Sequence, residues 1–131
     1  MKRKKRREKK REGFHIRLKV WIEDENGELI MGTGRAAMLE AIERTGSLNR
    51  AAKELNMSYR ALWERLRKTE ARLGRKLLIR AAGGKEGGGS ELTPLAKSMM
   101  EKFREMDRRL GEEADDLFAP YKIEFLEKKE D

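Results

Sequence analysis

The sequence predicts an α+β fold, and three features of the chain lead to this prediction. Residues 46–66 carry two short helical patterns joined by a tight turn. Residues 83–90 are rich in glycine and lie between two short apolar stretches that can pair as a hairpin. Residues 99–117 place apolar side chains at every third or fourth position, as a long helix does. Together they predict a winged helix-turn-helix with an N-terminal β-hairpin and a long C-terminal dimerisation helix.

Composition excludes several classes of protein. The chain has 131 residues, of which 43% are charged, with one histidine and no cysteine. No disulfide or cysteine-ligated metal site is possible, and one histidine cannot form a cluster for metal binding or charge relay. We therefore expect no enzymatic activity, no metal and no cofactor. No apolar run is long enough to span a bilayer, so we expect a cytoplasmic protein with no membrane partner. Enrichment in Lys, Arg and Glu is typical of thermophile proteins.

The N-terminal segment holds the whole charge excess of the chain. Residues 2–11 contain nine lysines or arginines and one glutamate, a net charge of +8, which equals the formal net charge of the whole chain. Because the segment has no apolar side chain to bury and repels itself, we expect residues 1–12 to be a disordered basic arm. Such an arm can neutralise DNA phosphates without reading sequence, or it can be a solubilising tail. Both alternatives stay open.

The arm precedes a predicted β-hairpin. Residues 14–22 alternate strictly between apolar and polar side chains, which predicts a half-buried strand. Asn26 and Gly27 form the dipeptide favoured in two-residue hairpin turns, and residues 28–31 can return as a second strand. The hairpin opens a winged helix-turn-helix domain at residues 13–93, which follows the arm at residues 1–12 and precedes a dimerisation helix with an acidic tail at residues 94–131.

Helix signals mark the next elements. A first helix is expected from about Arg35 to Thr45, with Gly46 as its left-handed cap. Ser47 is a suitable N-cap for a second helix, and Ser58 for a third one that ends at Leu73. The buried positions expected on these helices are Ala37, Met38, Leu39, Ala41 and Ile42 on the first, Leu48, Ala51, Ala52 and Leu55 on the second, and Leu62 and Leu66 on the third.

The C-terminal helix is expected to begin with Thr93 as N-cap and Pro94 at its first position. Its apolar stripe is close to a heptad seam, which favours packing against a second copy of the chain. Packing on its own domain is the alternative. The dimer interface predicted from this stripe and from the N-terminal strand consists of Phe14, Ile16, Leu18, Met99, Phe103, Met106, Leu110 and Leu117.

Helical phase predicts which side chains would meet DNA. With Leu62 and Leu66 inward, the third helix turns its opposite face to the major groove, and we expect Trp63 near the boundary to pack in the core. The expected base contacts are Tyr59, Arg60, Glu64 and Arg67. The expected contacts with the DNA backbone are Ser47, Asn49, Arg50, Ser58, Lys68 and, in the wing, Lys85.

Three pieces of the chain resemble the N-terminal domain of the molybdate-dependent transcriptional regulator (ModE) family. They are Gly46-Ser47, the stretch Ser-Tyr-Arg-Ala-Leu-Trp-Glu at residues 58–64, and the glycine-rich wing at residues 80–93. LysR-type regulators share the helix-turn-helix spacing and the ending Leu73-Gly74, and are the second family considered. The resemblance implies a homodimer, joined through the N-terminal strands and the last helix, on a pseudo-palindromic double-stranded DNA operator. Family members sense molybdate or tungstate in separate C-terminal domains, so these oxyanions are not expected as ligands of this chain.

Two other functions remain as alternatives to a sequence-specific regulator. The first is a non-specific architectural DNA- or RNA-binding protein that uses the basic arm as its main contact. The second is a small oxyanion sensor in which the glycine amides of residues 83–89 form an anion nest. An enzyme with a phosphate-binding loop is disfavoured, because Lys85 is followed by Glu86 and not by Ser or Thr.

Overall fold

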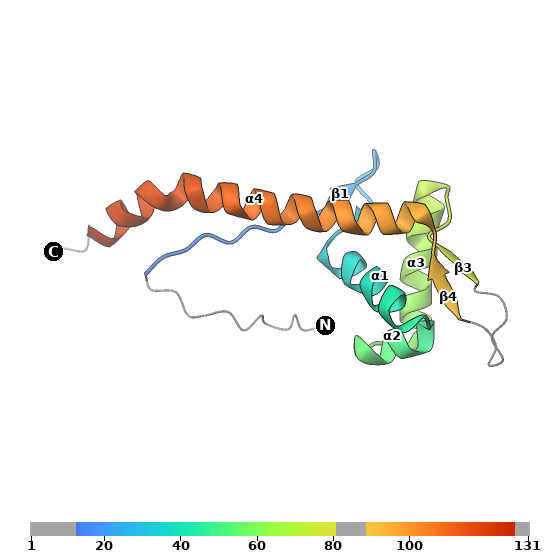
Figure 1. Ribbon diagram of the computed structural model, residues 1–131. Coiled ribbons are helices and arrows are strands. Elements are labelled where there is room, and N and C mark those ends of the chain that lie inside the picture. The colour runs from blue at the N-terminus through green and yellow to red at the C-terminus, as the bar shows by residue number, and fades with distance from the viewer. Residues whose placement is uncertain (1–12, 81–88, 128–131) are drawn as a thin grey trace. The chain divides into compact units, whose positions relative to one another are not determined.

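The computed structural model of the protein describes residues 13–80 and 89–127 (Figure 1). Predictions on residues 1–12 and 81–88, including the basic arm and Lys85, lie outside these ranges. The described chain divides into two compact units, one of residues 20–104 and one that combines residues 13–19 with residues 105–127. The elements are β1 (Ile22–Glu23), β2 (Leu29–Met31), α1 (Thr33–Thr45), α2 (Leu48–Glu54), α3 (Tyr59–Leu73), β3 (Leu78–Arg80), β4 (Ser90–Leu92) and α4 (Pro94–Glu127).

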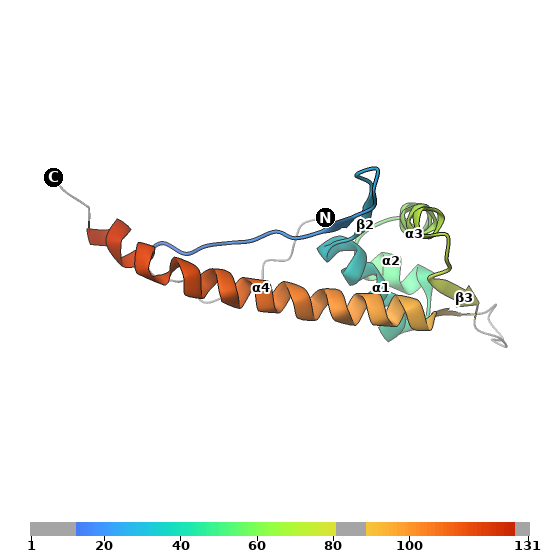
Figure 2. The same cartoon turned by 90° about the horizontal axis from the view of Figure 1, so that it is seen from above.

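The first unit is a three-helix core with two antiparallel hairpins. Helices α1, α2 and α3 pack on one another, β1 pairs with β2, and β3 pairs with β4. Figure 2 shows α3 nearly end-on, with β2 and β3 on opposite sides of it. This arrangement confirms the winged helix-turn-helix with an N-terminal hairpin. Burial of each large core side chain contributes roughly 1.5–3 kcal/mol; the largest fully buried ones are Phe103, Met31, Leu39, Ile42, Leu62, Leu66 and Leu77.

The N-terminal hairpin is shorter than the sequence predicted. Strand β1 contains only Ile22 and Glu23, so the strand expected over residues 14–22 is wrong for most of its length. The reason is that the partner strand β2 is short. It has three residues before α1 begins at Thr33, so it can form backbone hydrogen bonds only with the last part of the expected strand. Alternating side chains make a strand only where a neighbour supplies hydrogen bonds.

The turn of this hairpin also differs from the prediction. The Asp24 amide donates to the Glu28 carbonyl at 2.9 Å, which leaves a three-residue loop, not a two-residue one. The Asp24 carboxylate accepts from the amides of Asn26 at 2.8 Å and Glu28 at 3.0 Å. Gly27 adopts a φ of 81°, which a residue without a side chain reaches at no steric cost. The Asp24 carboxylate therefore selects the longer loop.

The helix-turn-helix agrees with the local signals in the sequence. The Ser47 hydroxyl accepts from the Arg50 amide at 3.1 Å, and the Ser58 hydroxyl accepts from the Ala61 amide at 3.0 Å, so both predicted N-caps are confirmed. Gly46 ends α1 in the left-handed conformation, also as predicted. Of the expected core of α1, Ala37 is only partly buried, and Ala36 lies in the core with the other four positions.

Polar side chains also fix helix α3 to its neighbours. Glu70, 9% exposed, accepts through Oε2 from the backbone amides of Leu77 at 2.8 Å and Leu78 at 3.2 Å, which joins α3 to the start of β3. Arg72 donates to the Leu29 carbonyl at 2.6 Å and so joins α3 to β2. Arg35 of α1 donates through Nε to the Thr69 hydroxyl at 3.0 Å.

Helix α4 begins as predicted, because the Thr93 hydroxyl accepts from the Ala96 amide at 3.1 Å. Its first turns pack on the first unit, and Arg104 donates two hydrogen bonds to the Glu40 carboxylate, at 2.6 and 2.7 Å. Phe103 is 1% exposed in the core of this unit, so its assignment to a dimer interface is wrong. The helix continues through Pro120 to Glu127, where the sequence analysis expected only an acidic tail.

The second unit contains a small aromatic cluster. Phe125 contacts three rings, with centroid distances of 6.1 Å to Phe14, 5.8 Å to Phe118 and 6.5 Å to Tyr121. These distances lie in the range of attractive aromatic pairs. None of the helices in the described part of the chain combines the length and apolar character needed to cross a lipid bilayer.

The Glu70 contacts generate a prediction about stability. Glu70→Ala leaves two backbone amides without an acceptor, one of them on the buried residue Leu77, and we expect a loss of about 1–3 kcal/mol in the free energy of unfolding. Urea unfolding followed by circular dichroism measures it. Glu64→Ala, at an exposed position of the same helix, is the control and should stay within about 0.5 kcal/mol of wild type. Equal effects of the two substitutions would contradict the structural role of Glu70.

Candidate nucleic-acid interface

The outer face of α3 carries the side chains predicted to contact bases. Leu62 and Leu66 are fully buried, and residues 60, 64 and 67, at spacings of four and three, lie on the opposite face. Arg60, Glu64 and Arg67 are all exposed there. Tyr59, in the first turn, is 48% exposed and lies four residues before Trp63, on the flank of the helix. The structure therefore brings three of the four predicted base contacts together on one accessible face, with Tyr59 exposed beside it.

Trp63 does not pack in the core as predicted. Its side chain is 41% exposed, and the Arg67 guanidinium lies 5.1 Å from the centre of its ring. The core stripe of α3 is already filled by Leu62, Leu66 and Thr69. Position 63 is rotated about 100° from position 62 around the helix axis, which puts the indole on the flank of the helix.

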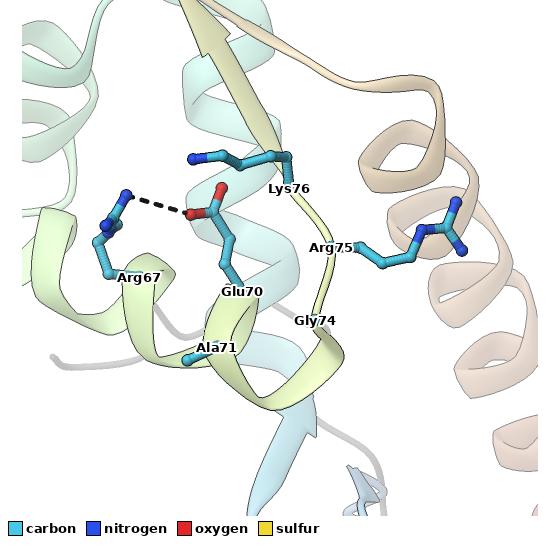
Figure 3. A pocket seen from close by; sticks show the side chains of 6 residues that line it. All are labelled: Arg67, Glu70, Ala71, Gly74, Arg75 and Lys76. Carbon is cyan, nitrogen blue, oxygen red and sulfur yellow. Dashed lines mark ion pairs between the residues drawn. The ribbon is translucent and has the colours of Figure 1, made fainter.

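Arg67 has a second neighbour besides the indole. Its Nη1 atom lies 3.7 Å from Oε1 of Glu70, and Figure 3 shows this pair at the end of α3. The same carboxylate accepts from the amides of Leu77 and Leu78 through its other oxygen. The ion pair belongs to the lining of a shallow pocket formed by Arg67, Glu70, Ala71, Gly74, Arg75 and Lys76.

The predicted contacts with the DNA backbone lie around the first turns of α2 and on the side of α3. Asn49, Arg50, Ser58 and Lys68 are exposed, and Ser47 is half-buried. The Ser47 and Ser58 hydroxyl oxygens accept the capping hydrogen bonds, which leaves each hydroxyl proton available to donate to a phosphate oxygen. The residue predicted in the wing, Lys85, lies outside the described chain.

The wing is attached to the helix-turn-helix through strand β4. Strands β3 and β4 pair with Leu78 opposite Leu92 and Arg80 opposite Ser90. The Ser90 amide donates to the Gly46 carbonyl at 3.0 Å, which links β4 to the turn between α1 and α2. The predicted strand–loop–strand arrangement of a wing is therefore confirmed in its strands, while its loop, residues 81–88, lies outside the described chain.

Sequence reasoning identified only Lys68 of a group of cations on the other flank of α3. Arg65, Lys68 and Arg72 follow one another at spacings of three and four, so they share one side of the helix. Arg35 of α1 lies beside them, half-buried: desolvation lowers the pKa of its guanidinium below the ordinary value, and the charges of Arg65 and Arg72 lower it further. The spacing on α3 was a visible signal, but the contribution from α1 was not. These cations add positive charge next to the predicted phosphate contacts.

The described residues contain no group of three or more His, Cys, Asp or Glu side chains arranged to hold a metal ion. The chemistry available at the surface of α3 is that of guanidinium, carboxylate, phenol and indole groups. These groups recognise base edges and phosphates by hydrogen bonds and charge.

Comparison with known proteins identifies the domain. The family model described as bacterial regulatory helix-turn-helix protein, lysR family, matches residues 35–97 of the chain. The chain is 40% identical over 73 residues to the molybdenum transport protein ModE of Azotobacter vinelandii, covering 56% of this chain and 27% of that protein. It is 35% identical over 80 residues to the transcriptional regulator ModE of Haemophilus influenzae, covering 61% of this chain and 31% of that protein. The chain thus spans roughly a third or less of the length of the curated relatives it matches.

Solved structures give the same result. The DNA-binding domain of CbnR in complex with DNA has a TM-score of 0.54 and 26% identity, covering 70% of this chain and 99% of that chain. Full-length CbnR, a LysR family transcriptional regulator, has a TM-score of 0.51 and 27% identity, covering 68% of this chain and 29% of that chain. The resemblance to ModE and to LysR-type regulators predicted from the sequence is confirmed. Residues 35–97 thus match the LysR-family helix-turn-helix domain, and the chain is similar in sequence to the ModE regulators.

Proposed function

We propose that the protein is a sequence-specific, double-stranded DNA-binding transcriptional regulator that acts as a homodimer. The observation that carries this proposal is the exposed outer face of α3, where Arg60, Glu64 and Arg67 stand on a helix held by two capped ends and a wing. The similarity to a CbnR domain bound to DNA supports the same function. Relatives named as transcriptional regulators support it as well.

In this proposal α3 enters the major groove. Arg60 donates two hydrogen bonds to the O6 and N7 acceptors of a guanine, and Glu64 accepts from the amino group of a cytosine. Tyr59 contacts a thymine methyl group or a phosphate. Each good bidentate contact contributes about 1–3 kcal/mol of discrimination against the wrong base.

The backbone contacts hold the helix in register. Ser47, Ser58 and Asn49 donate hydrogen bonds to phosphate oxygens, while Arg50 and Lys68 add charge. We propose Lys85 as a further phosphate contact from the wing. Because each phosphate contact releases counterions, affinity falls steeply with salt concentration.

We propose that dimerisation uses apolar side chains of the second unit. In the described chain, six of the predicted interface residues expose at least a third of their surface, and they include three on α4. Such exposure is expected of side chains that a partner subunit covers. Met99 is partly buried against the core of the first unit and contributes less. The six are Phe14, Ile16, Leu18, Met106, Leu110 and Leu117.

The effector question has a direct test. Molybdate and tungstate are not expected to bind this chain, and calorimetry with each oxyanion measures binding. Detectable heat would favour the alternative in which the glycine amides of residues 83–89 form an anion nest.

Deletion of residues 1–11 tests the architectural alternative: it should abolish DNA binding if the arm is the main contact and only weaken it in a sequence-specific regulator.

The first prediction concerns the target. Selection of bound duplexes from a random library, at about 0.15 M salt to weaken non-specific phosphate binding, should recover a pseudo-palindromic sequence. Its half-sites should lie one helical turn apart, about 34–36 Å, as a two-fold symmetric dimer requires. Recovery of no common sequence would contradict the proposal and favour a non-specific binder.

The second prediction concerns base recognition. Arg60→Ala should weaken binding to the selected duplex by about 1–3 kcal/mol and relax the preference at one base pair. Binding to the selected duplex and to its single-base-pair variants measures both effects. Lys102→Ala, which removes an exposed cation of α4, is the matched control and should leave base preference unchanged. An equal loss on every sequence would reassign Arg60 to a phosphate contact.

The third prediction concerns the dimer. Leu117, 65% exposed, should become buried between subunits, and Leu117→Lys should weaken dimerisation by tenfold or more, since burial of a leucine side chain contributes about 1.5–3 kcal/mol. Sedimentation equilibrium measures the dissociation constant. Asp115→Lys, a change of charge at an exposed position on the opposite side of α4, is the control. An unaltered dissociation constant in Leu117→Lys would exclude this side chain from the interface.

A further inference from the structure

An exposed tryptophan on α3 lies against an arginine of the outer face. Trp63 precedes Arg67 by four residues, a spacing at which side chains on a helix meet. The guanidinium carbon lies 5.1 Å from the centre of the indole ring, within the range of a cation–π interaction. The indole remains 41% exposed, so the pair stands at the surface and not in the core.

A second contact restrains the same arginine. Oε1 of Glu70 lies 3.7 Å from Nη1 of Arg67, and the Glu70 side chain is itself only 10% exposed. The other carboxylate oxygen accepts from the amides of Leu77 and Leu78, so the position of the carboxylate is set by the backbone of β3 and its approach. Arg67 is therefore held at one face by the indole ring and at one end by a fixed carboxylate. Figure 3 shows the pair with the carboxylate.

These two restraints leave a defined edge of the guanidinium accessible. The group has five N–H donors in one plane. Glu70 faces Nη1, which leaves the edge formed by Nε and Nη2 for other acceptors, while the stacked indole limits rotation of the plane. The side chain loses less conformational freedom on binding than an unrestrained arginine would. The acceptors that match two parallel N–H donors in the major groove are O6 and N7 of guanine.

From this geometry we propose that Trp63 is a specificity-determining positioning residue, which together with Glu70 orients Arg67 to read one guanine. The inference rests on the proposed function. It differs from the assignment of Arg67 as a base contact, because it assigns sequence recognition to a side chain that itself need not touch a base. It also makes the wing a participant: Glu70 is fixed by the start of β3, so the strand that carries the wing sets the position of a base-reading side chain.

Substitutions at both residues test the inference in the full-length protein. Arg67→Lys keeps the charge but removes the planar fork, and it should lower discrimination at one base pair of the selected duplex. Trp63→Leu should lower discrimination at the same base pair by about 3- to 30-fold, the range expected for loss of a cation–π contact. Trp63→Phe keeps an aromatic face and should recover most of that discrimination. Binding to all single-base-pair variants of the duplex supplies the measurement.

The outcomes separate positioning from mere stabilisation. The inference is overturned if Trp63→Leu leaves base discrimination unchanged. It is also overturned if Trp63→Leu lowers discrimination at a base pair that Arg67→Lys does not affect. Trp21→Leu, which removes the other exposed indole of the chain and lies outside α3, is the control for a general loss of aromatic surface and should leave discrimination unchanged. A wild-type protein that selects no sequence overturns the proposed function and this inference with it, whereas a selective wild type with unaffected Trp63 variants overturns the inference alone.

A spectroscopic measurement keeps the test decisive if Trp63→Leu does not fold. The chain has two tryptophans, so Trp21→Phe leaves Trp63 as the only indole. Addition of the selected duplex should shift or quench its emission, because the pair becomes enclosed in the groove. In the double variant Trp21→Phe and Arg67→Lys, the Trp63 emission of the free protein should also change, because the guanidinium beside the indole ring is gone. Emission that responds neither to the duplex nor to Arg67→Lys would overturn the inference.

Discussion

The hydrogen bonds from two backbone amides to the Glu70 carboxylate are the contact on which the arrangement of the domain depends. Strand β3 follows α3 after a short turn, and without this acceptor the amide of Leu77 would be buried without a partner and that of Leu78 would be partly buried without one. A buried carboxylate is itself unfavourable unless it is paired, and here two amides and Arg67 compensate it. One side chain thus satisfies the backbone of the wing, fixes the end of the recognition helix and fixes a cation on its surface.

Local signals were sufficient to predict the helices from the sequence. Ser47, Ser58 and Thr93 each accept the hydrogen bond expected of an N-cap, and Gly46 and Gly74 end their helices in the left-handed conformation. These features involve partners within a few residues, so the pattern of the sequence contains them. The strand over residues 14–22 failed for the opposite reason, because its existence depends on a partner elsewhere in the chain and that partner is only three residues long.

The candidate site was predictable as a face but not as a set of contacts. Helical phase placed Arg60, Glu64 and Arg67 on the outer surface correctly, since the buried leucines define the opposite side. It did not predict the position of Trp63, because an amphipathic side chain at the boundary can turn toward the core or toward solvent. In the structure the core side of α3 is filled by other side chains, and the indole lies at the surface. Nor could it identify Arg35 as a neighbour of the cations on α3, since that contact joins residues far apart in the sequence.

The hydrogen bond from the Ser90 amide to the Gly46 carbonyl gives the domain an internal reporter of wing motion. An amide proton exchanges with solvent only when its hydrogen bond opens, so the exchange rate at this one position measures how often β4 leaves the turn between α1 and α2. Because Ser90 belongs to the wing and Gly46 precedes the first helix of the motif, slower exchange in a complex would mean that binding stabilises the contact between these two parts of the domain.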